Sequence, residues 1–592
     1  MRNLAGSTIV LASLLVFSAI GQEPAPDAQV CNEDFARTLV EQQAAESRTV
    51  AETDKRVRML IRSADFLWKF DELKARDYFI KAFKVARERF AEKGFEKKRD
   101  GDSIRFLPDY RFEVIKGIAK RDAAWAKQLT EELLKEYEKA DADRDPMDKN
   151  REIDSVMGIA KDNVKTNPAL SWFLFRRLMQ ARVEHQWFWM LYGVAAEDPA
   201  FADALYKELL VSQANVSPWR LLFLSAYPFA RPRIFGYDSQ GYGASMRDGF
   251  APRPALQRQF IDTFLRRSDA FASDPANLNT VGENYRPNEA VYIVSTLNEL
   301  EPEIIQNFPS FIPRLASVRS KAFGMLSEEN RKNMMDRDKW KKSLNSTFEQ
   351  RIENLEKAEE EGKLKDSMIV EALLTPPKTD EQFRTLESWV DKITSEPGRG
   401  QTTNYFWFQR AKLAIKEGRF DDARRFTAKV PELQHAAMLQ FEIAEKQLAN
   451  LNDASSAYQT LADVSKLTRQ APDTVGKARV HLGLAKLYEK MNHSFAVSEL
   501  SDAVAVVNKL ENEDLMSGYV SMKIEVKDYS FFASFGVPGY GLEESFNAVS
   551  KEDFSLPLSN AKAISDKFYR TIAVIAVAKN CVDRPRPKVT AN

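Results

Sequence analysis

Residues 118–134 read IAKRDAAWAKQLTEELL, and a related pattern returns twice in the N-terminal half of the chain. Residues 194–210 read VAAEDPAFADALYKELL, and residues 159–179 read IAKDNVKTNPALSWFLFRRLM, with four additional residues in the turn. Each copy ends one helix on a β-branched residue and Ala, turns at Asp or Asn, and begins a second helix. Asp and Asn favour this position because their side chains accept hydrogen bonds from free amides of the next helix. The unit is therefore predicted to be a helical hairpin.

The three copies begin 41 and 35 residues apart, at residues 118, 159 and 194. Helical-repeat families have periods of about 34–47 residues. A single hairpin cannot bury its apolar face, so consecutive hairpins stack. We therefore predict an all-α fold, an α-solenoid of stacked helical hairpins, with an N-terminal array over residues 22–225.

Composition bounds the class of protein. With 592 residues the chain is longer than a single hydrophobic core usually allows. Lys plus Arg and Asp plus Glu are 86 each, so the formal net charge is zero. The chain therefore lacks the excess of basic residues that would indicate a nucleic-acid partner. Abundant charges of both signs are typical of long, exposed helices.

The first 21 residues are predicted to be a signal peptide. Arg2 is followed by the apolar run IVLASLLVFSAI over residues 9–20, and Ala19-Ile20-Gly21 fits a small-x-small cleavage site. A retained N-terminal anchor is the alternative. No later stretch is long and apolar enough for a membrane span. We therefore expect an exported protein, periplasmic or extracellular, without a transmembrane segment in the mature chain.

The two cysteines, Cys31 and Cys581, are near the two ends of the mature chain. An oxidising compartment favours a disulfide between them. The alternative is two independent thiols, with Cys581 buried in the apolar helix TIAVIAVAKNC. A disulfide requires Cα atoms within about 7 Å, which the ends of an open solenoid do not reach. A bridge would therefore require the array to curve back on itself.

Residues 141–152 carry a weak calcium-site pattern between two helices. Asp141, Asp143, Asp145 and Glu152 are at positions one, three, five and twelve, as in an EF-hand. The sixth position requires Gly, and Pro146 occupies it with a fixed φ of about −65°. Position eight, normally apolar, is an Asp. We therefore interpret the stretch as a solvated acidic turn and expect no metal and no cofactor.

The helical period stops between residues 226 and 255, where Pro, Gly, aromatic residues and arginines gather. Irregular stretches this long are usually functional or disordered, and disordered segments are poor in aromatics. Two interpretations remain: the loop packs across the concave face, or it is a binding surface. The candidate binding residues are Tyr227, Phe229, Arg231, Arg233, Phe235, Tyr237, Tyr242 and Arg247.

The chain is predicted to be helical again over residues 256–374, where a long charged helix carries a core stripe that includes Trp340 and Phe348. Consecutive prolines in Thr375-Pro376-Pro377-Lys378 indicate a linker. From 379 to 510 the hairpins show an aromatic residue in the first helix, Gly in the turn and Ala in the second helix. These residues are Trp407, Ala411, Gly418, Phe420, Ala423 and Phe426, with a second copy over 478–506.

This pattern, clearest at 404–430 and 478–506, resembles the tetratricopeptide repeat. The resemblance implies a helical-hairpin architecture and, by analogy only, binding of a protein partner. Residues 511–592 differ. Val520, Met522, Ile524 and Val526 alternate with polar residues, which predicts a short strand, and an apolar helix is expected around Ile564 to Cys581. We expect this strand to pair with a partner or with the long loop.

The sequence carries no recognisable catalytic motif. Its four histidines, His185, His435, His481 and His493, lack metal-ligand spacing, and no nucleophile elbow, Walker loop or dinucleotide fingerprint is present. We therefore predict an exported, non-catalytic scaffold that binds a protein or peptide partner. The alternative is a cell-envelope protein that binds or processes carbohydrate, for which a closed toroid and a pair of carboxylates are expected.

Overall fold

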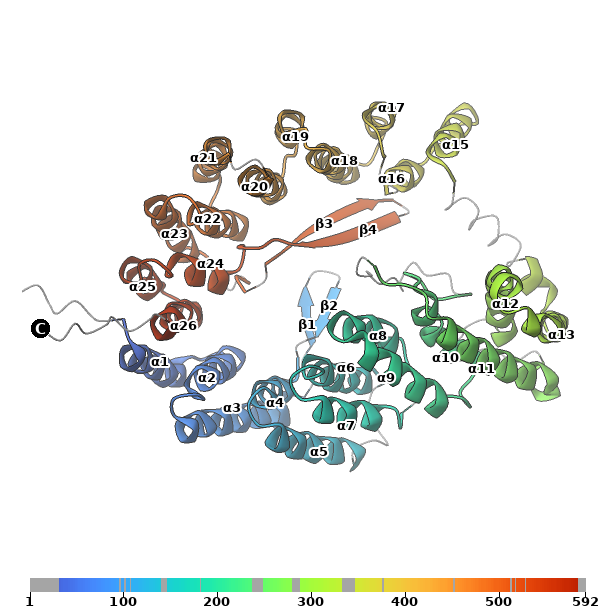
Figure 1. Ribbon diagram of the computed structural model, residues 1–592. Helices are drawn as coiled ribbons and strands as arrows, with labels where there is room; N and C mark the ends of the chain where they lie inside the picture. Colours follow the sequence, from blue (N-terminus) through green and yellow to red (C-terminus); the bar gives the residue numbers. More distant parts are fainter. Residues whose placement is uncertain are drawn as a thin grey trace, which may run out of the picture.

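The computed structural model of the chain describes residues 31–583, apart from 95–96, 101–102, 107, 140–145, 182, 237–248, 279–287, 333–345, 375–376, 451–452, 512–513, 517 and 528. The fold is mostly helical. Its helices form two arcs that lie opposite each other and meet where the two ends of the chain come together (Figure 1). The predicted signal peptide lies outside the described residues.

The first arc contains one hydrophobic core that extends from Val57 to Leu326. A small antiparallel sheet of β1 (Lys97–Asp100) and β2 (Ser103–Phe106) lies on its inner side (Figure 1). Its helices are α1 (Glu33–Glu46), α2 (Thr53–Leu67), α3 (Glu72–Lys93), α4 (Tyr110–Ala119), α5 (Ala123–Lys139), α6 (Pro146–Asp162), α7 (Pro168–Leu178), α8 (Gln186–Glu197), α9 (Pro199–Ser212), α10 (Pro218–Leu221), α11 (Pro254–Ser273), α12 (Glu289–Asn307) and α13 (Ile312–Gly324).

The second arc returns the chain to its starting point (Figure 1). Its helices are α15 (Phe348–Glu360), α16 (Asp366–Leu374), α17 (Asp380–Val390), α18 (Glu396–Lys416), α19 (Phe420–Thr427), α20 (Leu433–Asn450), α21 (Ala454–Gln470), α22 (Val475–Tyr488), α23 (His493–Val507), α24 (Leu542–Val549), α25 (Ser555–Lys562) and α26 (Lys567–Asp583). The predicted helical stripe lies partly outside the described residues, because Trp340 does, and so do Thr375 and Pro376 of the linker.

Consecutive helices pack in pairs, as the opening unit predicts. The pairs α4/α5, α6/α7 and α8/α9 coincide with the three copies of the unit, and α18/α19, α20/α21 and α22/α23 repeat the arrangement in the second arc. Asp122 and Asp198 accept from the amides of Trp125 and Phe201 at 2.9 and 3.0 Å. In the middle unit the side chain of Asn167 does not cap its own helix. Its Nδ2 donates instead to the Ala119 carbonyl of the preceding unit at 3.2 Å.

The C-terminal segment contains the predicted strand, β3 (Tyr519–Val526), with the expected alternation of buried and exposed residues. Its pairing corrects our expectation. The strand pairs antiparallel with the next stretch of the chain, β4 (Tyr529–Gly536), and Val526 lies opposite Tyr529. A two-residue connection brings the two strands together locally, so neither the long loop nor a partner is needed.

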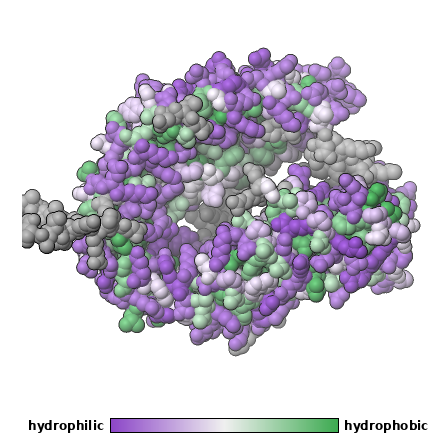
Figure 2. All heavy atoms as spheres, in the orientation of Figure 1, coloured by the Kyte–Doolittle hydropathy of each residue, from purple (hydrophilic) through white to green (hydrophobic). Residues whose placement is uncertain are grey.

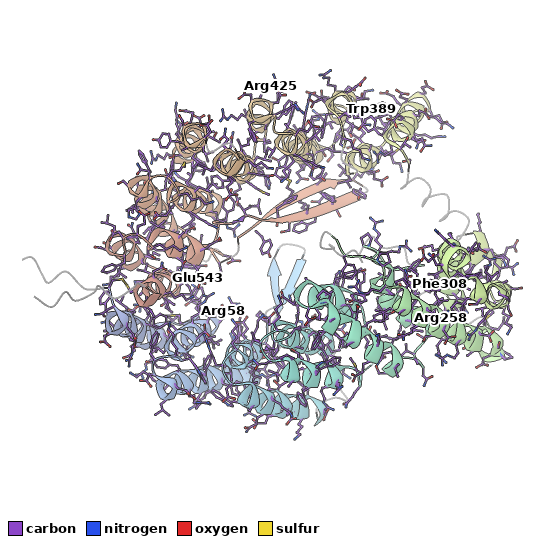
Figure 3. The ribbon with its side chains drawn as sticks, in the orientation of Figure 1. Arg58, Arg258, Phe308, Trp389, Arg425 and Glu543 are labelled. Atoms are coloured by element: carbon purple, nitrogen blue, oxygen red, sulfur yellow. A yellow bond between two sulfur atoms is a disulfide. The ribbon has the colours of Figure 1, made fainter. Side chains whose placement is uncertain are left out.

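The two chain ends form a packed seam. Ala36 and Val40 of α1 share a buried apolar cluster with Ile575 and Ala578 of α26. Ion pairs surround it: Lys55 Nζ lies 2.8 Å from Asp566, Arg570 Nη2 lies 2.8 Å from Glu46, and Arg62 pairs with Glu543. Figure 3 labels Glu543 on α24 and Arg58 on α2, on the two sides of this seam. Burial of apolar surface is the main force that holds such a seam together.

A disulfide joins Cys31 and Cys581 at the edge of this seam, with their Cα atoms 4.9 Å apart. The helices α1 and α26 already place the two cysteines side by side, so the bond adds a covalent link to a packed contact. It closes a loop of 550 residues. The chain of helices therefore curves back on itself, as a bridge between these residues requires.

We expect the double substitution Cys31→Ser, Cys581→Ser to lower the melting temperature of the oxidised protein. Removing a cross-link that closes a long loop costs about 2–5 kcal/mol of unfolding free energy. Differential scanning calorimetry measures the effect, and reduction of the wild-type chain should reproduce it. Two free thiols in the intact mass of the oxidised protein, or an unchanged melting temperature, would contradict this prediction.

Candidate functional site

The hairpin β3–β4 lies between the two arcs, beneath α16 and α18 (Figure 1). The space-filling view shows a largely hydrophilic molecule that is hollowed between the arcs (Figure 2). One face of the hairpin is buried: Met522, Ile524 and Val526 belong to the core cluster of α18, and Phe531 and Phe535 pack against it. The second arc therefore holds the hairpin as a fixed part of its inner wall.

The tip of the hairpin touches the backbone of α18 at Gly398. A Cβ atom at this position would lie 2.5 Å from Val526 Cγ1 and 2.9 Å from the Glu525 carbonyl oxygen. The backbone of α18 approaches the hairpin so closely at this position that only glycine fits. The side chain of Gln401, also on α18, accepts from the Glu525 amide at 2.7 Å. These contacts fix the tip and satisfy part of the outer edge of β3.

His435 on α20 holds the same edge further along. Its Nε2 lies 3.3 Å from the Ser521 carbonyl oxygen, and its Nδ1 lies 2.9 Å from Asn404 Nδ2. Since a carbonyl oxygen only accepts, Nε2 carries the proton and Nδ1 accepts from the amide. Burial lowers the pKa of His435, against the raising effects of the Ser521 carbonyl and Glu432. The neutral ring is therefore the form that suits this position.

These bonds reveal which backbone groups of the hairpin point outward. Ser521 and Glu525 bond away from β4, so both belong to non-hydrogen-bonded pairs of the antiparallel ladder. Their partners Ser534 and Ser530, and Phe532 between them, consequently direct their own N–H and C=O groups away from β3. Within the described part of the chain, no backbone group pairs with this outer edge of β4.

The face of the hairpin opposite α18 is accessible. Phe532 is 67% exposed and Tyr519 is 60% exposed, which makes them the two most exposed aromatic residues in the part of the chain that the structure describes. Lys523 and Glu525 form an ion pair of 2.5 Å beside them. The candidate functional site is therefore the outer edge of β4 with Phe532, which we call the β4 edge. Sequence reasoning missed it, although the uncharged run YSFFASFG after a strand is a readable signal.

A cavity of about 400 Å³ at the seam contains the two adjacent carboxylates Glu543 and Glu544. Burial opposes ionisation of Glu543, but Arg62 and Lys579 outweigh it and hold its pKa below the ordinary value. Burial also acts on Glu544, whose pKa is lowered by Lys486 and the Gly539 amide. A glycosidase needs one carboxyl that stays protonated near neutral pH. Neither of these two groups meets that requirement.

A cluster of polar side chains, several of them buried, connects α21, α22 and α23. Glu499 accepts from Ser465 Oγ at 2.5 Å and lies 2.7 Å from His481 Nδ1, and Arg469 bridges it to Asp502 at 3.2 Å on each side. His481, Glu499 and Asp502 are close enough to ligate a metal. A guanidinium already pairs with both carboxylates, and the serine bonds Glu499 and not the histidine. The arrangement is therefore that of a satisfied ion-pair network rather than a catalytic triad.

Much of the long loop is core where the structure describes it. Tyr227, Phe229 and Phe235 are buried, and the Tyr227 hydroxyl donates to Asp203 at 2.7 Å. Arg231 lies over the Phe235 ring at 3.9 Å and pairs with Glu299, while Arg233 is exposed. These residues pack between α8, α9, α11 and α12 and not at the hairpin. Tyr237, Tyr242 and Arg247 lie outside the described residues.

The acidic turn is described only at its end. Asp141, Asp143 and Asp145 lie outside the described residues, and Glu152 is on α6, which begins at Pro146. Proline is favoured in the first turn of a helix, where its missing N–H costs nothing. The position where an EF-hand needs a flexible glycine therefore begins a helix here.

Comparisons with known proteins give no family for this chain: no protein-family model matches it, and no curated protein matches it. Among the described residues, no helix has the length and apolarity to cross a membrane.

Acidic pH is expected to loosen the hairpin through His435. Its pKa is lowered in the folded state, so its contribution to stability is complete above the unfolded value of about 6.5 and is lost as pH falls below it. Hydrogen exchange of the β3 amides at pH 7.5 and pH 5 measures this loss. The variant His435→Gln keeps a donor and an acceptor without titrating, so it should show a smaller pH dependence. Equal pH dependence in both proteins would assign the effect to other groups.

Proposed function

We propose that this protein is an exported, non-catalytic scaffold of tetratricopeptide-like helical repeats that binds a protein partner in its interior. The partner would present an extended segment that joins the β4 edge as a third strand. In this mode, main-chain hydrogen bonds supply affinity and side-chain contacts supply specificity. The single observation that carries the proposal is the open, uncharged edge of β4.

Open strand edges are normally protected, because they pair readily with other chains. Natural proteins place charges, proline or bulges on them, or cover them. The eight residues of β4 include no charged residue and no proline. The edge of β3, in contrast, is occupied by Gln401 and His435. The hairpin therefore has one closed edge and one edge suited to receive a strand.

The two arcs explain how the protein tolerates such an edge. The hairpin lies between them (Figure 1), where another folded molecule cannot easily bring its own sheet edge alongside. A single extended segment is narrower, because strands in a sheet lie about 4.8 Å apart. The geometry therefore favours a peptide or a protein terminus over a second copy of this chain.

The accessible face of the hairpin indicates the side chains of such a segment. Phe532 lies opposite Lys523 in the ladder, with Ser530 and Ser534 on its two sides. Aromatic and β-branched residues pair well with an aromatic residue on a neighbouring strand. We expect the bound segment to alternate, with a β-branched or aromatic residue beside Phe532 and polar residues elsewhere.

The alternative, carbohydrate processing, receives less support. It requires two carboxylates across a substrate, one of them with a raised pKa. The adjacent pair in the seam cavity, Glu543 and Glu544, is held by cations, and both pKa values are lowered. The scaffold is therefore the function that we propose.

A peptide selection tests the proposal. Random peptides displayed on phage are selected on the full mature chain, and the affinities of the selected peptides are measured by fluorescence polarisation. Ser534→Pro removes an outward N–H without touching the ladder to β3, and should weaken binding about tenfold or more. Ser534→Thr keeps the N–H and is the matched control, with affinity expected within about twofold.

Chemical modification of the selected peptides provides an independent test. Methylation of alternate backbone nitrogens in one register should abolish binding, and methylation in the other register should not, because only every second residue faces β4. Equal binding of both methylated peptides, or full binding to Ser534→Pro, would show that strand addition is wrong. Failure to select any peptide for the wild-type chain would count against the scaffold itself.

A further inference from the structure

A second cavity, separate from the hairpin, lies among α1, α2 and α3; Figure 1 shows these helices at the start of the first arc. Its volume is about 330 Å³, and it is bounded by the end of α1, the first half of α2 and the middle of α3. Apolar groups form most of its wall: Ala44, Leu60, Val85 and the ring of Tyr78. The volume is within the range of small-molecule sites, which are concave and mostly apolar with a few polar groups.

Three cationic side chains complete the wall: Arg48, Arg56 and Lys81. Lys81 pairs with Asp77. Arg48 and Arg56 form no ion pair with any carboxylate in the described part of the chain. The other cationic residues of α2 do form ion pairs. Lys55 pairs with Asp566 and Glu52, Arg58 pairs with Glu113, and Arg62 pairs with Glu543.

Arg56 also lacks a hydrogen-bond partner for one of its guanidinium nitrogens in the part of the molecule that the structure describes. Its Nε is shielded from solvent and has no hydrogen-bond partner among the described residues. A buried donor without an acceptor costs about 1–3 kcal/mol, and more when the group is charged. The planar guanidinium suits a carboxylate or phosphate, which accepts two parallel hydrogen bonds. An anion placed between Arg48 and Arg56 would therefore satisfy both the charge and the buried donor.

We propose that this cavity binds a small amphiphilic anion, with an aliphatic or aromatic group against Leu60, Val85 and Tyr78 and an acidic head at Arg48 and Arg56. The space corresponds to roughly ten small heavy atoms, at about 30 Å³ for each water-sized group. An alkanoate of eight carbons fits this size. The site is independent of the β4 edge, so it stands or falls without the scaffold function.

Isothermal titration calorimetry on the full mature chain tests the site with octanoate as the probe. Octanoate should bind, while 1-octanol and octylammonium, which have the same chain without the negative charge, should bind at least tenfold more weakly. Acetate carries the head without the chain and should not compete. Equal affinity for octanoate and octanol would overturn the role of the arginines, and competition by acetate would overturn the role of the apolar wall.

Substitutions locate the binding. Arg56→Gln and Arg48→Gln should each weaken octanoate binding about tenfold. Arg37→Gln, on α1 and paired with Asp71 outside the cavity, should leave it unchanged. Val85→Trp places a ring in the cavity from a partly exposed position and should block binding while the circular-dichroism melt shows that the chain is folded. Unchanged affinity in Arg56→Gln would overturn the assignment.

Free fatty acids and phospholipids share this ligand chemistry. Sedimentation with phosphatidylglycerol vesicles separates the two sources. Co-sedimentation of the wild-type chain that Arg56→Gln abolishes would support a membrane lipid, and octanoate binding without co-sedimentation would support a free acid. Co-sedimentation that Arg56→Gln leaves intact would exclude this cavity as the lipid site.

Discussion

The packing of α1 against α26 is the contact on which the rest of the architecture depends. Without it, the two arcs of paired helices would have free ends, and the hairpin would no longer be held between them. Apolar side chains such as Val40 and Ile575 make the contact, ion pairs surround it, and the Cys31–Cys581 disulfide links it covalently. Because the two partners are more than 500 residues apart in the chain, the loop-closure entropy of this contact is large, and the disulfide offsets part of it.

Closure has a direct consequence for the hairpin. An uncharged strand such as β4, with one open edge and an exposed Phe532, is an aggregation hazard on an outer surface. Between the arcs it is accessible only to what enters the interior. The other edge of the hairpin is held by α18 and α20 through hydrogen bonds with Gln401 and His435. An edge that is already held in its strand conformation loses little conformational entropy when a further strand adds to it.

Charge pairing separates structural cations from candidate ligand-binding cations. The chain has as many acidic as basic residues, and the cations at the seam and along the helices are mostly matched to carboxylates. Such pairs on a surface contribute little each. Arg48 and Arg56 have no such pair among the described residues, and both line an apolar cavity. Glu543 and Glu544 are paired with Arg62 and Lys486, and these ion pairs distinguish them from a catalytic dyad.

Local pattern alone determined the helical pairs, because caps such as Asp122 and Asp198 and the spacing of apolar residues act within a few residues of the chain. The alternation around Ile524 likewise predicted a strand. The partner of that strand, the burial of Tyr227 and Phe235 in the long loop, and the meeting of Cys31 with Cys581 depended on residues far apart in sequence. Small rotations between successive helical pairs accumulate along an array, and no single pair records their sum. The sequence therefore determined the helical pairs, and only the tertiary structure decided that the two ends of the chain meet and that an open strand edge lies between the arcs.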